Sequence, residues 1–413
     1  MKNPILALTL ISSSALFGAY HDTEDFNYNE GENSSTCCSP CCTPQPKKCI
    51  DCECYTPKYY DLQCDWGLFV SGEFLYWYAR ETHLSYAAVL TTPATLNDVT
   101  LQTPSSVKAF GVSWDPGFRV GIGYNWRCDG WDTYLNWTSF CNSRSDSVSV
   151  ASLDDGFIVS PWAYSLYGID GDSIILSTPW TSVKGKWSLN FNQIDLELGR
   201  KYWLSKCFSL RPYAGLRGQW LETTLKVDSN FVTSPNFDTR VTSATDSSKI
   251  TDDAWGGGFL VGIQPNWHLC SNFIIYSNWS GSLTWGEYKS KRSETFELTS
   301  GSITSTLPLK FDYNFYGMLA TIDLGIGFRW EENWCCDRYR TSLDLGWEHH
   351  LIFDYNHRIQ FTGLQTELES SPINAAAPTP TAPYAGGIGG LGYSESGCTL
   401  SMGGFVLRVR VDF

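Results

Sequence analysis

The sequence predicts an all-β protein, a transmembrane antiparallel β-barrel with an irregular Cys-rich segment before it. Three observations predict this fold. Long segments alternate apolar and polar side chains with the two-residue period of a strand. Short and long connections take turns along the chain, as in barrels with short periplasmic turns and longer extracellular loops. The chain also closes on such an alternating segment, whose last residue is the aromatic Phe413.

The final nine residues, 405–413, show the alternation most strictly. Every second side chain is apolar from Phe405 to Phe413, whereas Arg408, Arg410 and Asp412 lie between them. A soluble sandwich would turn such a charged face to bulk water, whereas a barrel turns its apolar face to lipid and its polar face to the lumen. We therefore expect Phe413 to act as the signal through which the barrel-assembly machinery inserts the chain into outer-membrane lipid.

Composition narrows the class of protein. Residues 1–19 resemble a secretory signal peptide, with Lys2 followed by a short apolar run. No later stretch of about 18 uninterrupted apolar residues could span a bilayer as a helix, so only a closed barrel could cross it. The 18 Trp and 22 Tyr suit the aromatic girdles of a barrel, and the net charge of −14 argues against nucleic-acid binding. We expect a signal peptide (1–19), a Cys/Pro-rich periplasmic segment (20–64) and a barrel (65–413).

The alternation places ten strands, or twelve if 145–182 contains another hairpin. The clearest strands are 117–127, 194–201, 214–220, 255–267, 322–330 and 341–348, and less regular ones are 66–80, 131–140, 272–285 and 309–318. Short turns are predicted at 128–130, 204–208, 268–271 and 331–338, and long loops at 88–108, 145–182, 228–250, 290–306 and 360–398.

The polar faces of these strands supply the candidate lumen residues. The basic candidates are Arg119, Arg127, Lys201, Arg217, Arg329, Arg408 and Arg410, and the acidic ones are Glu73, Asp195, Glu197, Asp323, Asp344, Glu348 and Asp412. One interpretation is a water-filled pore whose balanced charges give no strong ion selectivity. The other is a narrow barrel in which these residues pair across neighbouring strands and fill the interior, as side chains do in eight-stranded barrels.

The 15 cysteines are an odd number for an exported chain, which leaves at least one of them unpaired within it. Eight lie in the periplasmic segment, at Cys37, Cys38, Cys41, Cys42, Cys49, Cys52, Cys54 and Cys64. Spacing argues against zinc there, because the gap between the Cys pairs is short and no His lies among them. Five more lie in predicted short turns, at Cys128, Cys207, Cys270, Cys335 and Cys336, whereas Cys141 and Cys398 do not. We expect the turn and segment cysteines to form disulfide cross-links with other envelope proteins on the periplasmic side.

Several motifs resemble a known family. The run from Gly117 to Asn125 reads GFRVGIGYN, and Asp129 to Thr138 reads DGWDTYLNWT; GEFLYW from Gly72 and RPYAGLRG from Arg211 support them. Together they resemble the pore-forming outer-membrane proteins of Legionella and of environmental relatives of Chlamydia, over most of 65–413. The resemblance implies an outer-membrane porin for ions and small hydrophilic solutes. The Cys-rich segment is similar instead to the disulfide-dependent envelope of chlamydia-like bacteria.

Other functions remain open as alternatives. A non-conducting structural barrel or a surface adhesin would share the same pattern. A remote alternative is an outer-membrane protease, because His349, His350, Asp354 and His357 are placed near the outer end of a strand, with Asp252 and Asp253 as a second carboxylate pair. Since adjacent His residues on a strand face opposite ways, we expect no enzyme. We also expect no cofactor and no metal, and leave a homo-oligomer open.

Overall fold

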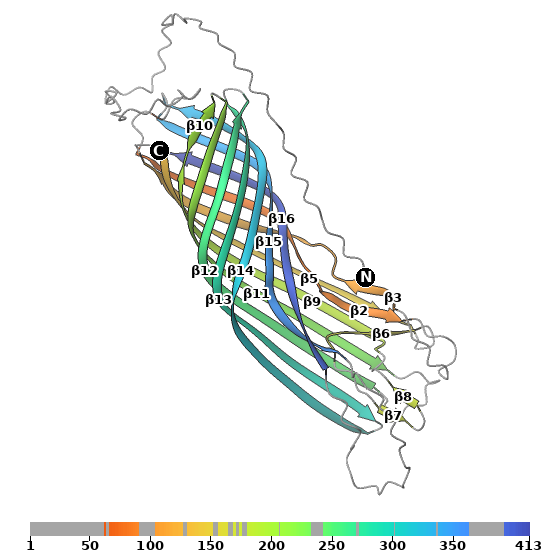
Figure 1. Ribbon diagram of the computed structural model, residues 1–413. Helices are drawn as coiled ribbons and strands as arrows, with labels where there is room; N and C mark the ends of the chain where they lie inside the picture. The colour runs from red at the N-terminus through yellow and green to blue at the C-terminus, as the bar shows by residue number, and fades with distance from the viewer. Residues whose placement is uncertain are drawn as a thin grey trace, which may run out of the picture. The chain divides into compact units, whose positions relative to one another are not determined.

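The computed structural model describes Leu62 and residues 66–90, 104–126, 130–151, 156–163, 168–170, 173–175, 180–205, 207–232, 243–269, 272–300, 302–335, 338–362 and 392–413. The predicted signal peptide and the periplasmic cysteine cluster lie outside these residues. In the part that is described, one antiparallel sheet curls into a closed barrel (Figure 1). No helix in the described ranges is long and apolar enough to cross a membrane.

Ten long strands make the wall, and their bounds fix the topology. They are β1 (Leu68–Glu81), β4 (Trp114–Asn125), β5 (Trp131–Ser149), β9 (Ser182–Arg200), β11 (Phe208–Val232), β12 (Ser243–His268), β13 (Phe273–Ser300), β14 (Ile303–Trp334), β15 (Tyr339–Thr362) and β16 (Gly392–Asp412). Each pairs with the next, β16 pairs with β1, and β9 pairs with β11, which closes the ring. The short β10 (Tyr202–Ser205) pairs only with β11. The predicted all-β barrel is confirmed, with ten wall strands.

One end of the barrel carries the short connections. Those after β4, β9, β12 and β14 are all at this end, and the last residue meets the first strand there: the Phe413 amide donates to the Leu68 carbonyl at 2.9 Å, and the Trp66 amide to the Phe413 carbonyl at 2.9 Å. In bacterial outer-membrane barrels short turns face the periplasm. We therefore call this end the periplasmic end and the opposite one the outer end.

Two predicted loops are wrong, because they are mostly strand. Strands β11 and β12 stay paired through Val232 and Ser243, and β13 and β14 through Ser300 and Ile303. The segments 228–250 and 290–306 are rich in Ser, Thr and Lys and have no apolar face that could contact lipid. The alternation rule therefore predicts loops there. Backbone pairing needs no such face, so the hairpins continue beyond the apolar band. Residues 145–182 add three short strands that are not part of the wall sheet: β6 (Phe157–Val159), β7 (Gly168–Asp170) and β8 (Ser173–Ile175).

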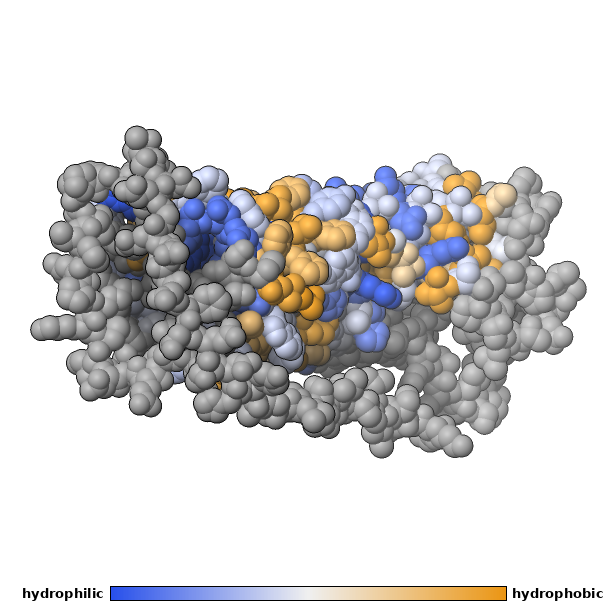
Figure 2. Space-filling view, turned by 90° about the horizontal axis from the view of Figure 1, so that it is seen from above, coloured by the Kyte–Doolittle hydropathy of each residue, from blue (hydrophilic) through white to orange (hydrophobic). Residues whose placement is uncertain are grey.

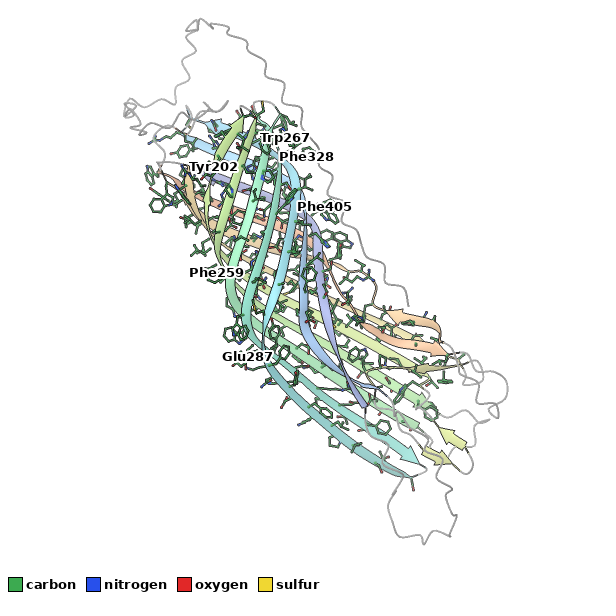
Figure 3. The ribbon with its side chains drawn as sticks, viewed as in Figure 1. Tyr202, Phe259, Trp267, Glu287, Phe328 and Phe405 are labelled. Carbon is green, nitrogen blue, oxygen red and sulfur yellow. The ribbon has the colours of Figure 1, made fainter. Side chains whose placement is uncertain are left out.

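The apolar faces predicted from the alternation point outward. Phe118, Val120 and Ile122 of β4 are exposed, as are Phe405, Leu407 and Val409 of β16. In Figure 2 apolar side chains gather on the outer wall in patches separated by polar ones. Figure 3 shows the labelled side chains projecting from the wall, with Tyr202, Trp267 and Phe328 towards the β10 end and Glu287 farthest from it.

Aromatic residues mark the outer edge of the apolar band. Trp220, Trp255, Glu287 and Tyr316 stand opposite one another across β11 to β14. Three of these four residues are aromatic, and we call the four the aromatic row. From Trp255 to Trp267 the strand covers about 40 Å at ~3.3 Å per residue, and a tilt of about 45° reduces the height to ~28 Å. This height suits the ~25 Å apolar band of outer-membrane barrels. We call this part of the barrel the membrane half.

Beyond the aromatic row the polarity of the wall reverses. Outward positions become polar, as at Lys226 and Lys249, whereas Leu225, Val227 and Ile250 point inward and are buried. We call this part, residues 182–191, 221–232, 243–254, 288–300 and 303–315, the outer half. Many of its inward side chains on β9, β11, β12 and β13 join one apolar cluster. On β14, Leu307 and Phe311 remain exposed.

Segments between the wall strands fill the outer half. Strand β2 (Ser85–Leu90) pairs with β3 (Pro104–Ala109) and with β6. Tyr86 of β2, Trp162 and Trp180 are all almost fully buried within the apolar cluster. The backbone of β9 comes close to these segments at Gly185, where a Cβ would lie 2.6 Å from the Phe110 ring. We call β2, β3, β6, residues 160–163 and Trp180 the inner sheet.

Two arginines fasten the inner sheet and its flanks to the wall. Arg292 of β13 donates to the Trp162 carbonyl at 2.7 Å and pairs with Glu294 at 2.8 Å. Arg144 of β5 donates to the carbonyls of Ala79 at 2.6 Å and Gly111 at 2.7 Å, and lies 4.4 Å from the Trp187 ring centroid. The outer half thus has an apolar core like that of a soluble protein, with buried charged residues such as Arg292, Glu294 and Asp246 at its edges.

Candidate functional site

The interior of the membrane half is charged, and its first centre is Arg217 on β11. The guanidinium donates to Asp195 on β9 at 2.7 Å and to Asp323 on β14 at 2.6 Å. Two strands separate β11 from β14 in the sheet. The second bond therefore crosses the lumen rather than joining neighbouring strands.

Arg119 on β4 is the second centre. It donates to Glu73 on the adjacent β1 at 2.6 Å and to Glu348 on β15 at 2.9 Å. Strands β16 and β1 lie between β4 and β15, so this contact too spans the lumen. The Arg119 side chain also donates to Thr138 of β5 at 2.8 Å, which orients the guanidinium from the other side.

Further pairs extend each centre around the wall. Glu73 accepts from Arg408 on β16 at 2.6 Å, and Asp344 on β15 accepts from Arg329 on β14 at 2.8 Å. A longer contact of 3.6 Å joins Arg408 to Asp344. The side chains of Glu73 and Asp344 are completely buried, so these carboxylates depend on the arginines for the interactions that water would otherwise supply.

His350 of β15 connects the two centres. Its Nδ1 lies 2.7 Å from Asp323, and its Nε2 lies 3.4 Å from Glu348. With these contacts the network is continuous, and we call it the lumen belt: Glu73, Arg119, Asp195, Arg217, Asp323, Arg329, Asp344, Glu348, His350 and Arg408. Four arginines and one histidine face five carboxylates.

The lumen belt leaves little space. A cavity of about 50 Å³ remains between belt residues and Tyr134, Tyr213 and Asn278. By volume it has room for about three or four water molecules. The arrangement can hold water and small ions near paired charges.

Smaller clusters lie towards the periplasmic end. Arg211 of β11 donates to Asp132 of β5 at 2.8 Å and to Glu197 of β9 at 3.0 Å. Arg410 pairs with Asp412 of its own strand at 2.5 Å, and its guanidinium lies 3.6 Å from the Phe69 ring centroid. The Arg211–Glu197 pair joins neighbouring strands and the Arg410–Asp412 pair lies on a single strand, whereas the Arg211–Asp132 pair reaches past β9, which lies between β5 and β11.

Most of the predicted lumen residues therefore come together. The structure brings Glu73, Arg119, Asp195, Arg217, Asp323, Arg329, Asp344, Glu348 and Arg408 into the belt, and Glu197, Arg410 and Asp412 into the periplasmic-end clusters. Lys201 instead lies in the connection after β9, exposed, with its ammonium 4.8 Å from the Trp203 ring centroid. Arg127 lies outside the described residues.

Three participants were not assigned to the lumen from the sequence. Asp132 and Arg211 are near strand ends, where the alternation is hard to phase, although both follow the inward parity of their strands. His350 is placed near the outer end of a strand by the sequence, because the predicted strand ends at residue 348, whereas β15 continues to Thr362. Because His350 is two residues from Glu348 on the same strand, both side chains face the same side, and this spacing could have assigned His350 to the lumen.

The residues of the protease alternative are spread over both faces. His349 faces away from the lumen belt and lies 3.3 Å from Ser401, whereas His350 belongs to the belt. Asp252 is buried and accepts from Ser290 at 2.7 Å, whereas the adjacent Asp253 is partly exposed. Asp354 has a left-handed backbone, with φ of 50°, at the bulge in β15, and His357 has no described side chain.

The cysteines divide between the two ends of the barrel. Cys207 and Cys335 are exposed in periplasmic-end connections, and Cys335 adopts a left-handed backbone with φ of 54°. Cys141 is exposed on β5, and Cys398 is buried on β16 opposite Asn356. The predicted partners Cys128, Cys270 and Cys336 lie outside the described residues, as does every cysteine from 37 to 64.

Comparison with known proteins settles the family. The family described as the Legionella pneumophila major outer membrane protein precursor matches residues 63–405. The chain belongs to this family. The match covers the described wall strands apart from the end of β16, and it confirms the resemblance seen in the motifs. The protein is therefore an outer-membrane β-barrel protein, located in the bacterial outer membrane.

Solved structures with a similar arrangement are distant in sequence. They include the outer membrane protease OmpT from Escherichia coli, with 10% identity and a TM-score of 0.32 over 84% of this chain and 96% of that one. The Pseudomonas aeruginosa FadL homologue has 8% identity and a TM-score of 0.22, over 84% and 90%. The toluene transporter TodX of P. putida also has 8% and 0.22, over 84% and 89%. No curated protein matches the chain.

Proposed function

We propose that the protein is an outer-membrane porin of low conductance, which lets ions and small hydrophilic solutes diffuse along the charged interior of its membrane half. The observation that carries the proposal is the lumen belt. Replacing buried ion pairs by apolar side chains of similar volume is often neutral or stabilising, so stability alone does not call for a charged interior. The outer half of the same barrel uses that apolar solution.

Polar atoms beside the belt support a wet interior. Among the described residues, Gln219 Oε1, Thr284 Oγ1 and Thr321 Oγ1 are buried and have no hydrogen-bond partner in the protein. Buried polar groups of this kind are usually satisfied by water. They line the inward faces of β11, β13 and β14, next to the arginine that crosses the lumen.

A closed structural barrel is the second candidate, and the inner sheet favours it. Trp162, Trp180 and Tyr86 fill the outer half with apolar side chains, through which hydrated ions do not pass. In the porin proposal, a path must open alongside the inner sheet. In the structural or adhesive alternative, the sheet stays in place and the barrel serves to stiffen the envelope or to display its outer end.

Single-channel recording of the purified full-length protein in planar bilayers separates the two. We expect small, steady conductance from the wild type. The double variant Arg119→Ser/Glu348→Ser removes one cross-lumen pair while Arg408 still neutralises Glu73, so conductance should rise several-fold. The matched control Arg410→Ser/Asp412→Ser removes a pair confined to one strand and should change conductance little.

The outcome that contradicts the porin proposal is a folded wild type and a folded Arg119→Ser/Glu348→Ser variant that both pass no current. The structural alternative would then replace it. Charge reversal at Arg408 is a poor test, because a glutamate there would face Glu73 and Asp344. We also propose no catalytic role for His350, since its ion-pair partners Asp323 and Glu348 both belong to the belt.

A further inference from the structure

A line of lysines crosses the outer surface of the outer half. Lys186 of β9 stands directly opposite Lys226 of β11, and Lys226 stands directly opposite Lys249 of β12. Lys249 pairs with Ser293 of β13, which pairs with Lys310 of β14. All four lysines are exposed and point outward. We call Lys186, Lys226, Lys249 and Lys310 the lysine row.

The lysine row contradicts the usual arrangement of an exposed sheet. Like charges directly opposite one another across strands destabilise the sheet, whereas opposite charges stabilise it. Neighbouring lysines of this surface follow the rule, since the register sets Lys184 opposite Asp228, Lys289 opposite Asp253 and Lys291 opposite Asp312. In the lysine row the register instead places lysine against lysine twice.

Carboxylates of the chain compensate the row only in part. The Lys226 ammonium lies 3.1 Å from Asp228, and that aspartate also stands opposite Lys184. Overall the chain has 29 basic residues against 43 acidic ones, so a row of lysines is not what composition alone would place on an exposed surface. The arrangement therefore favours an external polyanion that spans several strands.

The height of the lysine row above the apolar band limits which anionic ligands could reach it. On β11, β12 and β14 the lysine row lies six residues beyond the aromatic row, as from Trp220 to Lys226 and from Tyr316 to Lys310. Six residues cover about 20 Å of strand, or ~14 Å of height at a tilt of about 45°. Phosphates of glycerophospholipids lie at the edge of the apolar band, well below this level. The anionic sugars of a lipopolysaccharide core extend outward from that edge and reach it.

We propose that the lysine row binds the phosphate and carboxylate groups of the lipopolysaccharide core oligosaccharide in the outer leaflet. Each bound anion lies between two opposed ammonium groups and removes their repulsion. The contact holds the outer half against the surrounding glycolipid. The proposal is independent of conduction, because the row faces away from the lumen.

The test uses the full-length folded protein and the variant Lys186→Gln/Lys226→Gln/Lys249→Gln/Lys310→Gln. The matched control is Lys184→Gln/Lys289→Gln/Lys291→Gln, which removes outward lysines that have a carboxylate opposite. Binding is measured to vesicles of phosphatidylcholine containing core-bearing rough lipopolysaccharide, lipid A alone, or phosphatidylglycerol. Core-bearing lipopolysaccharide should bind the wild type and the control at least ~10-fold more tightly than the row variant, and added salt should reduce the difference.

The urea concentration at the midpoint of unfolding gives a second measurement. A row of lysines that only contacts water would not show the reversal described here. Without lipopolysaccharide the row variant should unfold at higher urea than the wild type, because the like-charge pairs are gone. With core-bearing lipopolysaccharide the order should reverse, because only the wild type gains from binding. Equal binding of wild type and row variant, or no reversal, would overturn the proposal. A full effect with lipid A or phosphatidylglycerol alone would overturn the assignment to the core sugars.

Discussion

The membrane half and the outer half of the barrel share strands β9 and β11 to β14, and differ in which face of these strands is apolar. Strand β11 shows it with one residue type: Leu216 faces outward and is 53% exposed, whereas Leu225 faces inward and is 1% exposed. Alternation is the same on both sides of Trp220. What changes is the chemistry of the outward face, which suits lipid on the periplasmic side of the aromatic row and water beyond it.

The arginines follow the same division. In the membrane half Arg217 is bound by two carboxylates that belong to strands on either side of the lumen. Arg292 of the outer half instead donates to the Trp162 carbonyl of the inner sheet, and Arg144 of β5 donates to the Ala79 carbonyl of the wall strand β1. The comparison teaches that this barrel has two interiors, one charged and one apolar, within a single wall. Five changes would break or sharpen it.

Removing Phe413 should have the largest effect, because it decides whether the wall closes. The residue binds Leu68 and Trp66 through its backbone and closes the seam of β16 with β1. We expect most of the heat-modifiable folded species to be lost on gels of outer membranes, with export unchanged. Phe405→Ala, which removes an outward ring from the same strand, is the control; equal loss in both would show that the end of the chain has no special part in assembly.

Arg217→Leu should destabilise the membrane half by about 3–5 kcal/mol, because it leaves two buried carboxylates without their cation. Urea unfolding of the protein in lipid vesicles measures the loss. Lys289→Leu removes an exposed pair with Glu287 in the outer half and should change stability little. A small effect at Arg217 would mean that the lumen is wet enough to solvate Asp195 and Asp323.

Leu225→Ala should lower the free energy of unfolding by about 2–5 kcal/mol, the cost of a cavity in a packed core. Leu216→Ala, on the same strand, trims a lipid-facing side chain and leaves no cavity, so its cost should be clearly smaller. Urea titration of both variants compares them directly. Equal costs would show that the outer half is not packed as a core.

Val261→Arg places a charge on the outward face midway between Trp255 and Trp267. Barrels lose about 2–4 kcal/mol for an arginine at the bilayer midplane. Thr245→Arg makes the same outward change on β12 in the outer half, where water surrounds the wall, and should be almost neutral. If Thr245→Arg costs as much as Val261→Arg in vesicles, the aromatic row does not mark the membrane edge.

Replacing cysteines should have the smallest effect on folding. These substitutions test whether cross-linking is confined to the periplasmic end of the barrel. Cys207 and Cys335 are exposed at the periplasmic end, and we propose that they form disulfides with other envelope proteins. Non-reducing gels of envelopes, with thiols trapped at lysis, should show high-mass species that Cys207→Ser/Cys335→Ser diminishes. Cys141→Ser should leave them unchanged; monomer alone from the wild type would contradict the proposal.

Strand identity and the lipid-facing surface could be predicted from the sequence because both depend on local alternation. Phe118 to Ile122 and Phe405 to Val409 point outward as expected, and the barrel has ten wall strands. The outer hairpins were missed for the same reason: segments such as 290–306 have no lipid-facing apolar side, so a rule based on lipid contact could not identify them as strands.

The sequence by itself determined the class of this protein, since a membrane imposes one strict periodic pattern on every strand that crosses it. It also determined most members of the lumen belt, because parity assigns a side chain to the inner face. Only the tertiary structure decided which of them meet. Arg119 contacts Glu348, and Arg217 contacts Asp323, across strands that are neighbours neither in sequence nor in the sheet. Such contacts depend on the curvature and closure of the wall, which no local pattern encodes.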